Sequence, residues 1–136
     1  MAHLHFHFLP ILVSALILWF LGAIWYSPVL FAKPWAAMVG IKMDGSAKKS
    51  MVPGMISSFI GDLILALMLA HFIVWSGANT IHRGAFIGLI TWLGFIAAPA
   101  FPQGIYEGRP FKLFAINTGY WLVGLIGVGI LLAVWQ

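Results

Sequence analysis

The chain has 136 residues and no cysteine, and its charged side chains are seven Lys or Arg and three Asp or Glu. Soluble domains carry about 25% charged residues, whereas this chain carries 7% and is 62% apolar, so an ordinary soluble domain is excluded. The length fits a single domain, 1–136, and the missing cysteines exclude disulfides and thiolate metal sites. The cations are dispersed and form no stripe, so we expect no nucleic-acid partner.

Four apolar stretches are each long enough to cross a bilayer as a helix, because a hydrocarbon core of about 30 Å needs roughly 20 helical residues. We predict these spans at 8–31, 52–76, 84–105 and 113–135. The sequence therefore predicts an all-α integral membrane bundle of four transmembrane helices surrounded by lipid. No Lys or Arg precedes the first apolar run, which is also longer than a signal-peptide core, so we expect this segment to stay in the mature protein.

Three histidines precede the first span, and they alternate as His3, His5 and His7. An extended backbone would point all three imidazoles to one side, and imidazole is a ligand for Zn, Cu and Ni. The segment is therefore a candidate external metal site. No carboxylate or thiol accompanies the histidines, and terminal segments are often disordered, so a segment without metal is the alternative. Nothing else in the chain suggests a cofactor.

The most informative polar residue is Asp62, which lies near the middle of the second span. A carboxylate at bilayer depth is costly, so it needs a partner, a proton or a water-filled cavity. Ser58 precedes it by one turn on the same helix face. One hypothesis is that Asp62 binds a proton or a substrate, and the other is that it is a neutral structural acid bonded to Ser58 or Asn117. The sequence leaves both hypotheses open.

The third span contains Pro99 and Pro102, and each proline removes a backbone donor from the helix. Irregular backbone at membrane depth is tolerated only where protein or a cavity satisfies it. We therefore predict a pocket here, together with the polar residues of the second and fourth spans. Its predicted residues are Asp62, Ser58, Gln103, Asn117 and Tyr120.

Small residues indicate where the helices approach each other closely. Gly84 and Gly88 form a seam with small-residue spacing in the third span, and Gly124 and Gly127 continue a stripe that starts at Asn117 in the fourth span. We expect both stripes to pack against neighbouring helices. In the connection between these spans, Glu107 and Arg109 flank Gly108 and could form a local ion pair.

Cations indicate the orientation in the membrane. Six of the seven lie in the first and third connections: Lys33, Lys42, Lys48, Lys49, Arg109 and Lys112. Only Arg83 lies on the opposite side. The positive-inside rule therefore places the lysine-rich connections in the cytoplasm and both termini on the non-cytoplasmic side. Aromatic residues at the span ends, including Trp25 and Tyr26, are interpreted as interfacial anchors.

Two sequence blocks carry a family resemblance. The first contains Trp25-Tyr26-Ser27-Pro28, and the second contains Arg109-Pro110, Asn117 and Gly119-Tyr120-Trp121. Together they resemble domain-of-unknown-function family 1761, a family of small bacterial membrane proteins. The resemblance implies a four-helix bundle in the bacterial cytoplasmic (inner) membrane. It implies no activity, and it gives no support to a role for Asp62, because the second span carries no matching motif.

No enzyme class is indicated. The chain lacks a cysteine nucleophile, a serine nucleophile elbow and a phosphate-cradling Gly-Lys-Ser/Thr loop. We therefore predict a non-enzymatic protein that acts through helix–helix contacts, either as a homo-oligomer or as a small subunit of a membrane complex. The alternatives are a small proton-coupled transporter that uses Asp62 and an external metal-binding protein that uses the N-terminal histidines.

Overall fold

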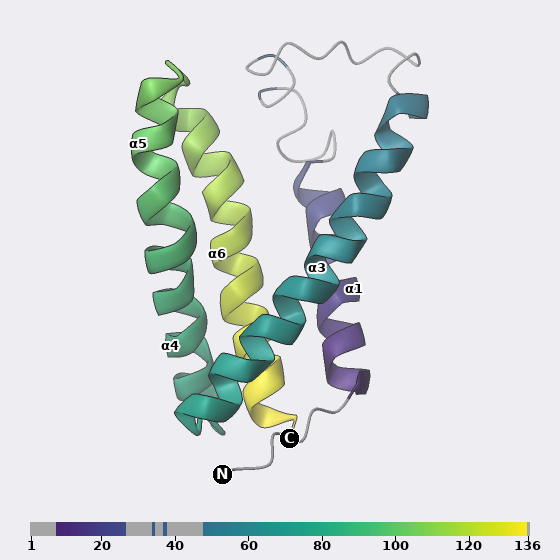
Figure 1. Cartoon of the computed structure of the whole chain (residues 1–136), viewed down its shortest axis with the longest axis vertical. Coiled ribbons are helices and arrows are strands. Elements are labelled where there is room, and N and C mark those ends of the chain that lie inside the picture. Colours follow the sequence, from purple (N-terminus) through teal and green to yellow (C-terminus); the bar gives the residue numbers. More distant parts are fainter. Residues whose placement is uncertain (1–7, 27–33, 35–36, 38–47, 136) are drawn as a thin grey trace.

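The computed structural model describes residues 8–26, 34, 37 and 48–135. Residues 8–26 and 48–135 form helices and the short connections between them. The elements are α1 Phe8–Trp25, α3 Lys48–Ser76, α4 Ile81–Trp92, the π-helical turn η2 Leu93–Ala97, α5 Ala98–Tyr106 and α6 Phe111–Val134. Because α4, η2 and α5 follow one another without a break, they form one long helix (Figure 1).

Four of these helical segments are long and apolar enough to cross a membrane: Phe8–Trp25, Val52–Ser76, Ile81–Tyr106 and Phe111–Val134. The prediction of an all-α bundle with four membrane helices is therefore confirmed. Large apolar side chains are exposed on every one of these helices, which suits contact with lipid. We conclude that the chain is a multi-pass membrane protein.

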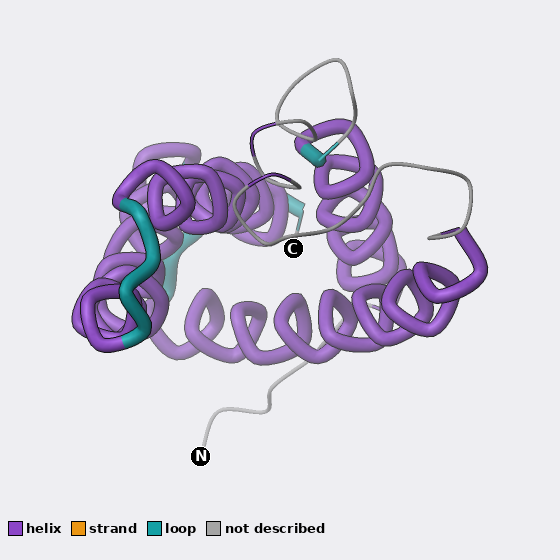
Figure 2. Tube along the Cα trace, turned by 90° about the horizontal axis from the view of Figure 1, so that it is seen from above, coloured by secondary structure: helices purple, strands orange, loops and turns teal. Residues whose placement is uncertain are grey.

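Successive helices run in opposite directions. The start of α1, the turn at 77–80 and the end of α6 lie at one end of the bundle, and the turn at 107–110 lies at the other end (Figure 1). α6 is the central helix, because it contacts α1, α3, α4 and α5. α3 has 29 residues, about 43 Å at 1.5 Å per residue. Being longer than a bilayer core, it crosses α1 and α6 obliquely on one side of the bundle (Figure 2).

The tightest contact joins α4 to α6 through glycine. A Cβ atom on Gly84 would lie 2.5 Å from the Gly129 carbonyl oxygen, and one on Gly88 would overlap the Leu125 carbonyl. The predicted seam at Gly84 and Gly88 is therefore confirmed. The prediction for Gly127 is wrong, since a Cβ atom there would meet nothing within 4 Å.

The two faces of α6 explain this difference. Gly124 packs against Leu18 of α1, and Gly129 packs against Gly84 of α4. Gly127 lies on neither face and is exposed. One stripe of small residues was expected on α6, whereas the helix uses separate stripes for its two neighbours.

Several helix boundaries differ from the predicted spans. α1 ends at Trp25, with Tyr26 in a turn, while the predicted continuation at 27–31 lies outside the described residues. α4 begins at Ile81 and not at 84, because the Thr80 side chain caps it by accepting a hydrogen bond from the Arg83 amide at 3.2 Å. Gly77, with a φ of 73°, ends α3 in the left-handed conformation that favours glycine.

The two prolines do not break the third helix. The chain instead makes one wide π-turn at 93–97, in which the Ala98 amide donates to the Leu93 carbonyl. This turn directly precedes Pro99, whose ring would clash with the preceding turn of a regular α-helix. The expected irregular backbone is therefore a π-turn followed by a helix that continues through Pro102.

The glycine seam gives a first testable prediction. Gly88→Ala should destabilise the protein by about 1–3 kcal/mol, because the added methyl group has no space beside Leu125. Gly127→Ala is the matched control, since open space surrounds that position, and it should be neutral or slightly stabilising. Thermal unfolding in detergent compares the two variants. Equal unfolding temperatures would contradict the close α4–α6 approach.

Candidate functional site

Asp62 is buried in the middle of the bundle, with 3% of its surface exposed. Neither oxygen of its carboxylate has a hydrogen-bond or ion-pair partner among the described residues. The carboxylate lies close enough to the Tyr120 phenol of α6 to interact with it electrostatically. A carboxylate at this depth without a partner is held neutral or is reached by water or a cation.

A second unpartnered polar group lies in the same part of the bundle. The Ser14 side chain of α1 is fully buried, and its Oγ has no hydrogen-bond partner. The Trp19 indole of α1 donates to the Met55 carbonyl of α3 at 3.1 Å, which fixes the pairing of the two antiparallel helices. Ser14 precedes Trp19 by about 7.5 Å along the axis of α1, and Asp62 follows Met55 by about 10.5 Å along the axis of α3. Because the two helices are antiparallel, Ser14 and Asp62 both lie on the same side of the Trp19–Met55 bond and at similar depths.

Sequence reasoning missed Ser14. The sequence feature that could have identified it is that Ser14 carries the only hydroxyl group between Phe8 and Trp25. The Tyr120 hydroxyl donates to the Leu18 carbonyl one turn further along α1, at 2.6 Å. The centre of the bundle therefore brings together oxygen atoms from α1, α3 and α6.

The predicted partners of Asp62 are placed differently. Ser58 is exposed and makes no hydrogen bond to Asp62. Asn117 is engaged elsewhere, because its Oδ1 accepts a hydrogen bond from the Tyr26 hydroxyl at 2.8 Å. The hypothesis of an acid bonded to Ser58 or Asn117 is therefore wrong. The reason is that Asn117 faces the end of α1, while the Ser58 side chain lies on the exposed surface of α3.

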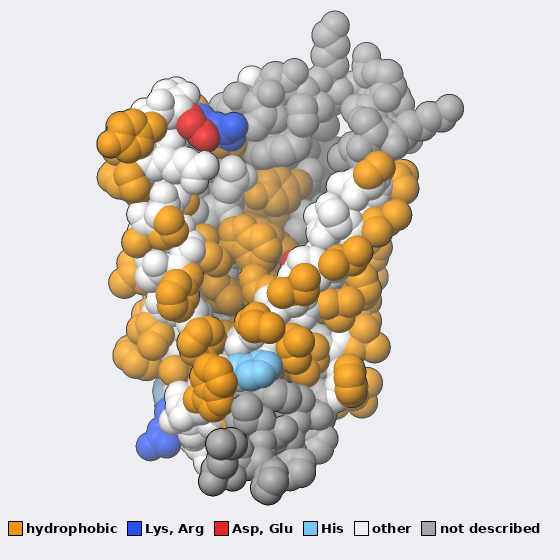
Figure 3. All heavy atoms as spheres, in the orientation of Figure 1, with side chains coloured by type: hydrophobic (Ala, Val, Ile, Leu, Met, Phe, Trp, Pro, Cys, Tyr) orange, Lys and Arg blue, Asp and Glu red, His pale blue; other side chains and the backbone are white. Residues whose placement is uncertain are grey.

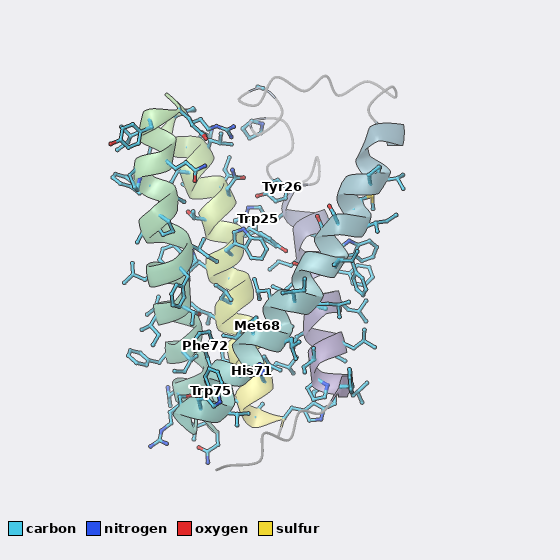
Figure 4. All side chains as sticks on the ribbon, viewed as in Figure 1. Trp25, Tyr26, Met68, His71, Phe72 and Trp75 are labelled. Atoms are coloured by element: carbon cyan, nitrogen blue, oxygen red, sulfur yellow. The ribbon has the colours of Figure 1, made fainter. Side chains whose placement is uncertain are left out.

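Trp25 and Tyr26 connect α1 to α6. The Trp25 indole donates to the Ile116 carbonyl at 2.9 Å, one residue before the Tyr26 partner, Asn117. Gly119 leaves room for the indole, since a Cβ atom there would lie 3.3 Å from the Trp25 ring. Both side chains lie at the end of α1 that approaches α6 (Figure 4). Their polar atoms therefore bind protein, and their interpretation as interfacial anchors stays a prediction.

A third ring binds the same part of α6 from the opposite side. The Trp92 indole, directly before the π-turn, donates to the Thr118 carbonyl at 2.7 Å. A carbonyl oxygen has two lone pairs, so it can accept this bond in addition to its helical one. α6 thus receives hydrogen bonds from α1, from the turn that follows α1 and from α4 at three consecutive residues, Ile116, Asn117 and Thr118.

A cavity of about 380 Å³ lies between α5 and α6 near the turn that joins them. Its lining includes Gln103 and Asn117, as predicted, but not Asp62, Ser58 or Tyr120. The residues of the predicted pocket therefore lie in separate parts of the bundle, with Gln103 and Asn117 at the cavity and Asp62 away from it. The reason is that α3 contacts α6 but leans away from α5 (Figure 1).

The ion pair expected beside this cavity is confirmed. Arg109 Nε lies 2.8 Å from Glu107 Oε2, and Gln103 Nε2 donates to the other carboxylate oxygen at 3.3 Å. Pro110 follows as the residue before the first turn of α6. These contacts fix the turn between α5 and α6.

Seven residues named from the sequence lie outside the described residues: His3, His5, His7, Ser27, Pro28, Lys33 and Lys42. The external metal site therefore stays a prediction. Within the part of the chain that the structure describes, no three His, Cys, Asp or Glu side chains gather as a metal site would require.

The fold and the α1–α6 contact define a four-span helical membrane protein whose paired sequence blocks meet in space. The family model described as protein of unknown function (DUF1761) matches residues 9–133. The chain therefore belongs to this family, as its two sequence blocks indicated. Searches of curated proteins and of solved structures found no match.

The Tyr26–Asn117 bond gives a second prediction. Tyr26→Phe should cost about 1 kcal/mol of stability, because it leaves the Asn117 oxygen without its donor. Tyr106→Phe is the control, since that ring is 91% exposed. Combining Tyr26→Phe with Asn117→Ala in a double-mutant cycle should yield a coupling of about 0.5–1.5 kcal/mol. Additive effects would exclude this bond.

Proposed function

We propose that this protein is a non-enzymatic protein of the bacterial cytoplasmic membrane that acts through helix–helix contacts as a homo-oligomer. The observation that supports this proposal is the surface of α3. Its residues from Val52 to Ser58 are all exposed, although the same helix is buried at Ala66, Leu69 and Ile73. The half of α3 after Asp62 is thus packed in the bundle. The half before it contacts Trp19 of α1 and exposes the side chains from Val52 to Ser58 to lipid or a partner.

The exposed half of α3 carries small residues on one face. Gly54, Ser58 and Gly61 follow one another at intervals of four and three residues, which places them on one stripe. A Cβ atom on Gly54 or Gly61 would meet nothing within 4 Å. Small residues allow helix backbones to approach closely in membranes, where apolar area alone gives little driving force.

The internal packing of the chain supports the same use of small residues. Gly84, Gly88 and Gly129 close the α4–α6 contact, whereas the stripe on α3 is free. The half of α3 that carries the stripe lies apart from α5 (Figure 1). Large apolar side chains are exposed along this half, among them Val52, Ile56 and Ile60, as they are over much of the described surface in Figure 3, so a helix from a second copy would meet a surface of matching chemistry.

The proposed orientation follows the cations. The end of the bundle with Arg109 and Lys112 would face the cytoplasm, and the end with Arg83 and both termini would lie outside. The described connections at 77–80 and 107–110 have four residues each. These two connections offer little surface outside the membrane, so the proposal rests on the helices themselves.

The oligomer gives a third prediction. The wild-type protein should form a dimer or a larger homo-oligomer in mild detergent, and Gly61→Leu should convert it to a monomer because a bulky side chain would block the stripe. Gly127→Leu, at an open position on α6, should leave the oligomer intact. Native mass measurement distinguishes these states. A wild-type monomer, or a stoichiometric complex with a different protein, would contradict the homo-oligomer.

We propose proton-coupled transport as a second candidate function. The supporting observation is the buried Asp62 carboxylate, which has no partner among the described residues. Ionisable groups inside membrane spans are rare and mark proton and ion pathways. Four helices enclose little space, so a path would be completed by a second copy beside α3.

Replacing the carboxylate by its isosteric amide gives the fourth prediction. Proteoliposomes that contain a pH-sensitive dye should show proton flux above that of empty vesicles, and Asp62→Asn should abolish it. Expression and assembly should persist, because an uncharged amide is less costly at this depth than a carboxylate. Glu107→Gln removes an acid from the α5–α6 turn and should retain the flux. Absence of flux in the wild type, or equal flux in Asp62→Asn, would contradict transport.

A further inference from the structure

The cavity between α5 and α6 offers hydrogen-bond donors in excess of acceptors. The carboxylate of Glu107 is already engaged at both oxygens, by Arg109 at 2.8 Å and by Gln103 at 3.3 Å. The negative charge on the cavity wall is therefore matched within the protein. A ligand would meet the groups that remain free.

Two side chains on the wall supply free donors. Arg109 uses its Nε for Glu107, and its four terminal guanidinium N–H groups have no acceptor on any other described residue. Asn117 accepts from Tyr26 through Oδ1, so its amide N–H groups remain available. Both residues line the cavity. A planar guanidinium with free N–H groups matches the oxygens of a phosphate or a carboxylate.

The backbone amides and the charged side chains beside the cavity also favour a ligand that accepts hydrogen bonds. Pro110 gives no side-chain cap to α6, and the Phe111 and Lys112 amides donate to no acceptor in the described part of the chain. Arg109 and Lys112 outweigh Glu107, so the local charge is positive. The cavity wall therefore favours an acceptor that carries negative charge.

Most of the remaining wall is apolar. Phe101, Phe111 and Phe114 line the cavity, and the Phe114 ring lies 5.5 Å from each of the other two rings. The cavity lies where α5 ends and α6 begins, so it is at the level where the apolar spans reach the membrane surface. Its occupant would have an acidic end and an apolar body.

We infer that this cavity binds the phosphate group of a membrane phospholipid. The phosphate oxygens accept hydrogen bonds from Arg109 and Asn117, and the glycerol and first acyl carbons lie against the phenylalanine rings. This binding requires neither an oligomer nor proton transport, because all of the groups belong to one chain and lie apart from Asp62.

Native mass spectrometry of the full-length protein in detergent tests this inference with three probes: phosphatidylglycerol, diacylglycerol with the same acyl chains, and glycerol phosphate. The wild type should retain one phosphatidylglycerol and bind diacylglycerol and glycerol phosphate at least tenfold more weakly. Equal binding of diacylglycerol would overturn the phosphate contact. Equal binding of glycerol phosphate would assign the site to a soluble phosphate and overturn the lipid.

Substitutions of Arg109 and Glu107 test whether the guanidinium itself binds the lipid or whether the ion pair between the two residues is what matters. Arg109→Gln should weaken phosphatidylglycerol binding by about tenfold, as expected for the loss of hydrogen bonds to a charged group. Glu107→Gln should bind as tightly as the wild type or more tightly, because it releases the guanidinium from its carboxylate. Arg83→Gln, at the other end of the bundle, is the charge-matched control. Unchanged binding in Arg109→Gln, or an equal loss in Glu107→Gln, would overturn the inference.

Discussion

Hydrogen bonds from aromatic rings to α6 hold the bundle together. Lipid is as apolar as the helices, so burial of apolar side chains gives little net force for packing one membrane helix on another. Polar contacts and close backbone approach must supply it. The Trp25 and Trp92 indoles bind the Ile116 and Thr118 carbonyls, and Tyr120 returns a bond from α6 to Leu18 of α1. These bonds fix the rotation and register of three helices.

Close approach complements these bonds on the same helix. Gly84 and Gly88 bring α4 against Gly129 of α6, while Gly119 makes space for the Trp25 ring on the side of α1. α6 therefore needs small residues towards both neighbours, and it has them at different rotational positions. This requirement explains why the second sequence block of the family, around Asn117 to Trp121, combines a polar residue, glycine and rings.

The sequence predicted the fold because length and hydropathy alone determine four membrane helices. It also predicted the seam at Gly84 and Gly88, since small residues four positions apart lie on one face of a helix. It could not assign the matching residue on α6. Gly124, Gly127 and Gly129 are all small, and only the rotation of the helix selects Gly129 for α4 and Gly124 for α1.

The candidate site was harder to predict for a related reason. Trp25 and Tyr26 lie at a helix end, where interfacial anchoring and internal hydrogen bonding require the same residue types. Gln103 and Asn117 were correctly assigned to one cavity, because both follow from position along neighbouring helices. Asp62 was wrongly added to it, since the oblique path of α3 carries this residue towards Tyr120 and away from α5.

Asp62 lies where α3 changes from an exposed to a packed helix. Residues 52–58 are exposed, whereas Ala66, Leu69, Ala70 and Ile73 belong to the core. An ionised carboxylate at this depth needs water or a cation, whereas a neutral one can remain enclosed. The charge of Asp62 and the packing of α3 are therefore coupled. The small-residue stripe begins on the same turns, so assembly and proton binding would act on one element, the exposed half of α3.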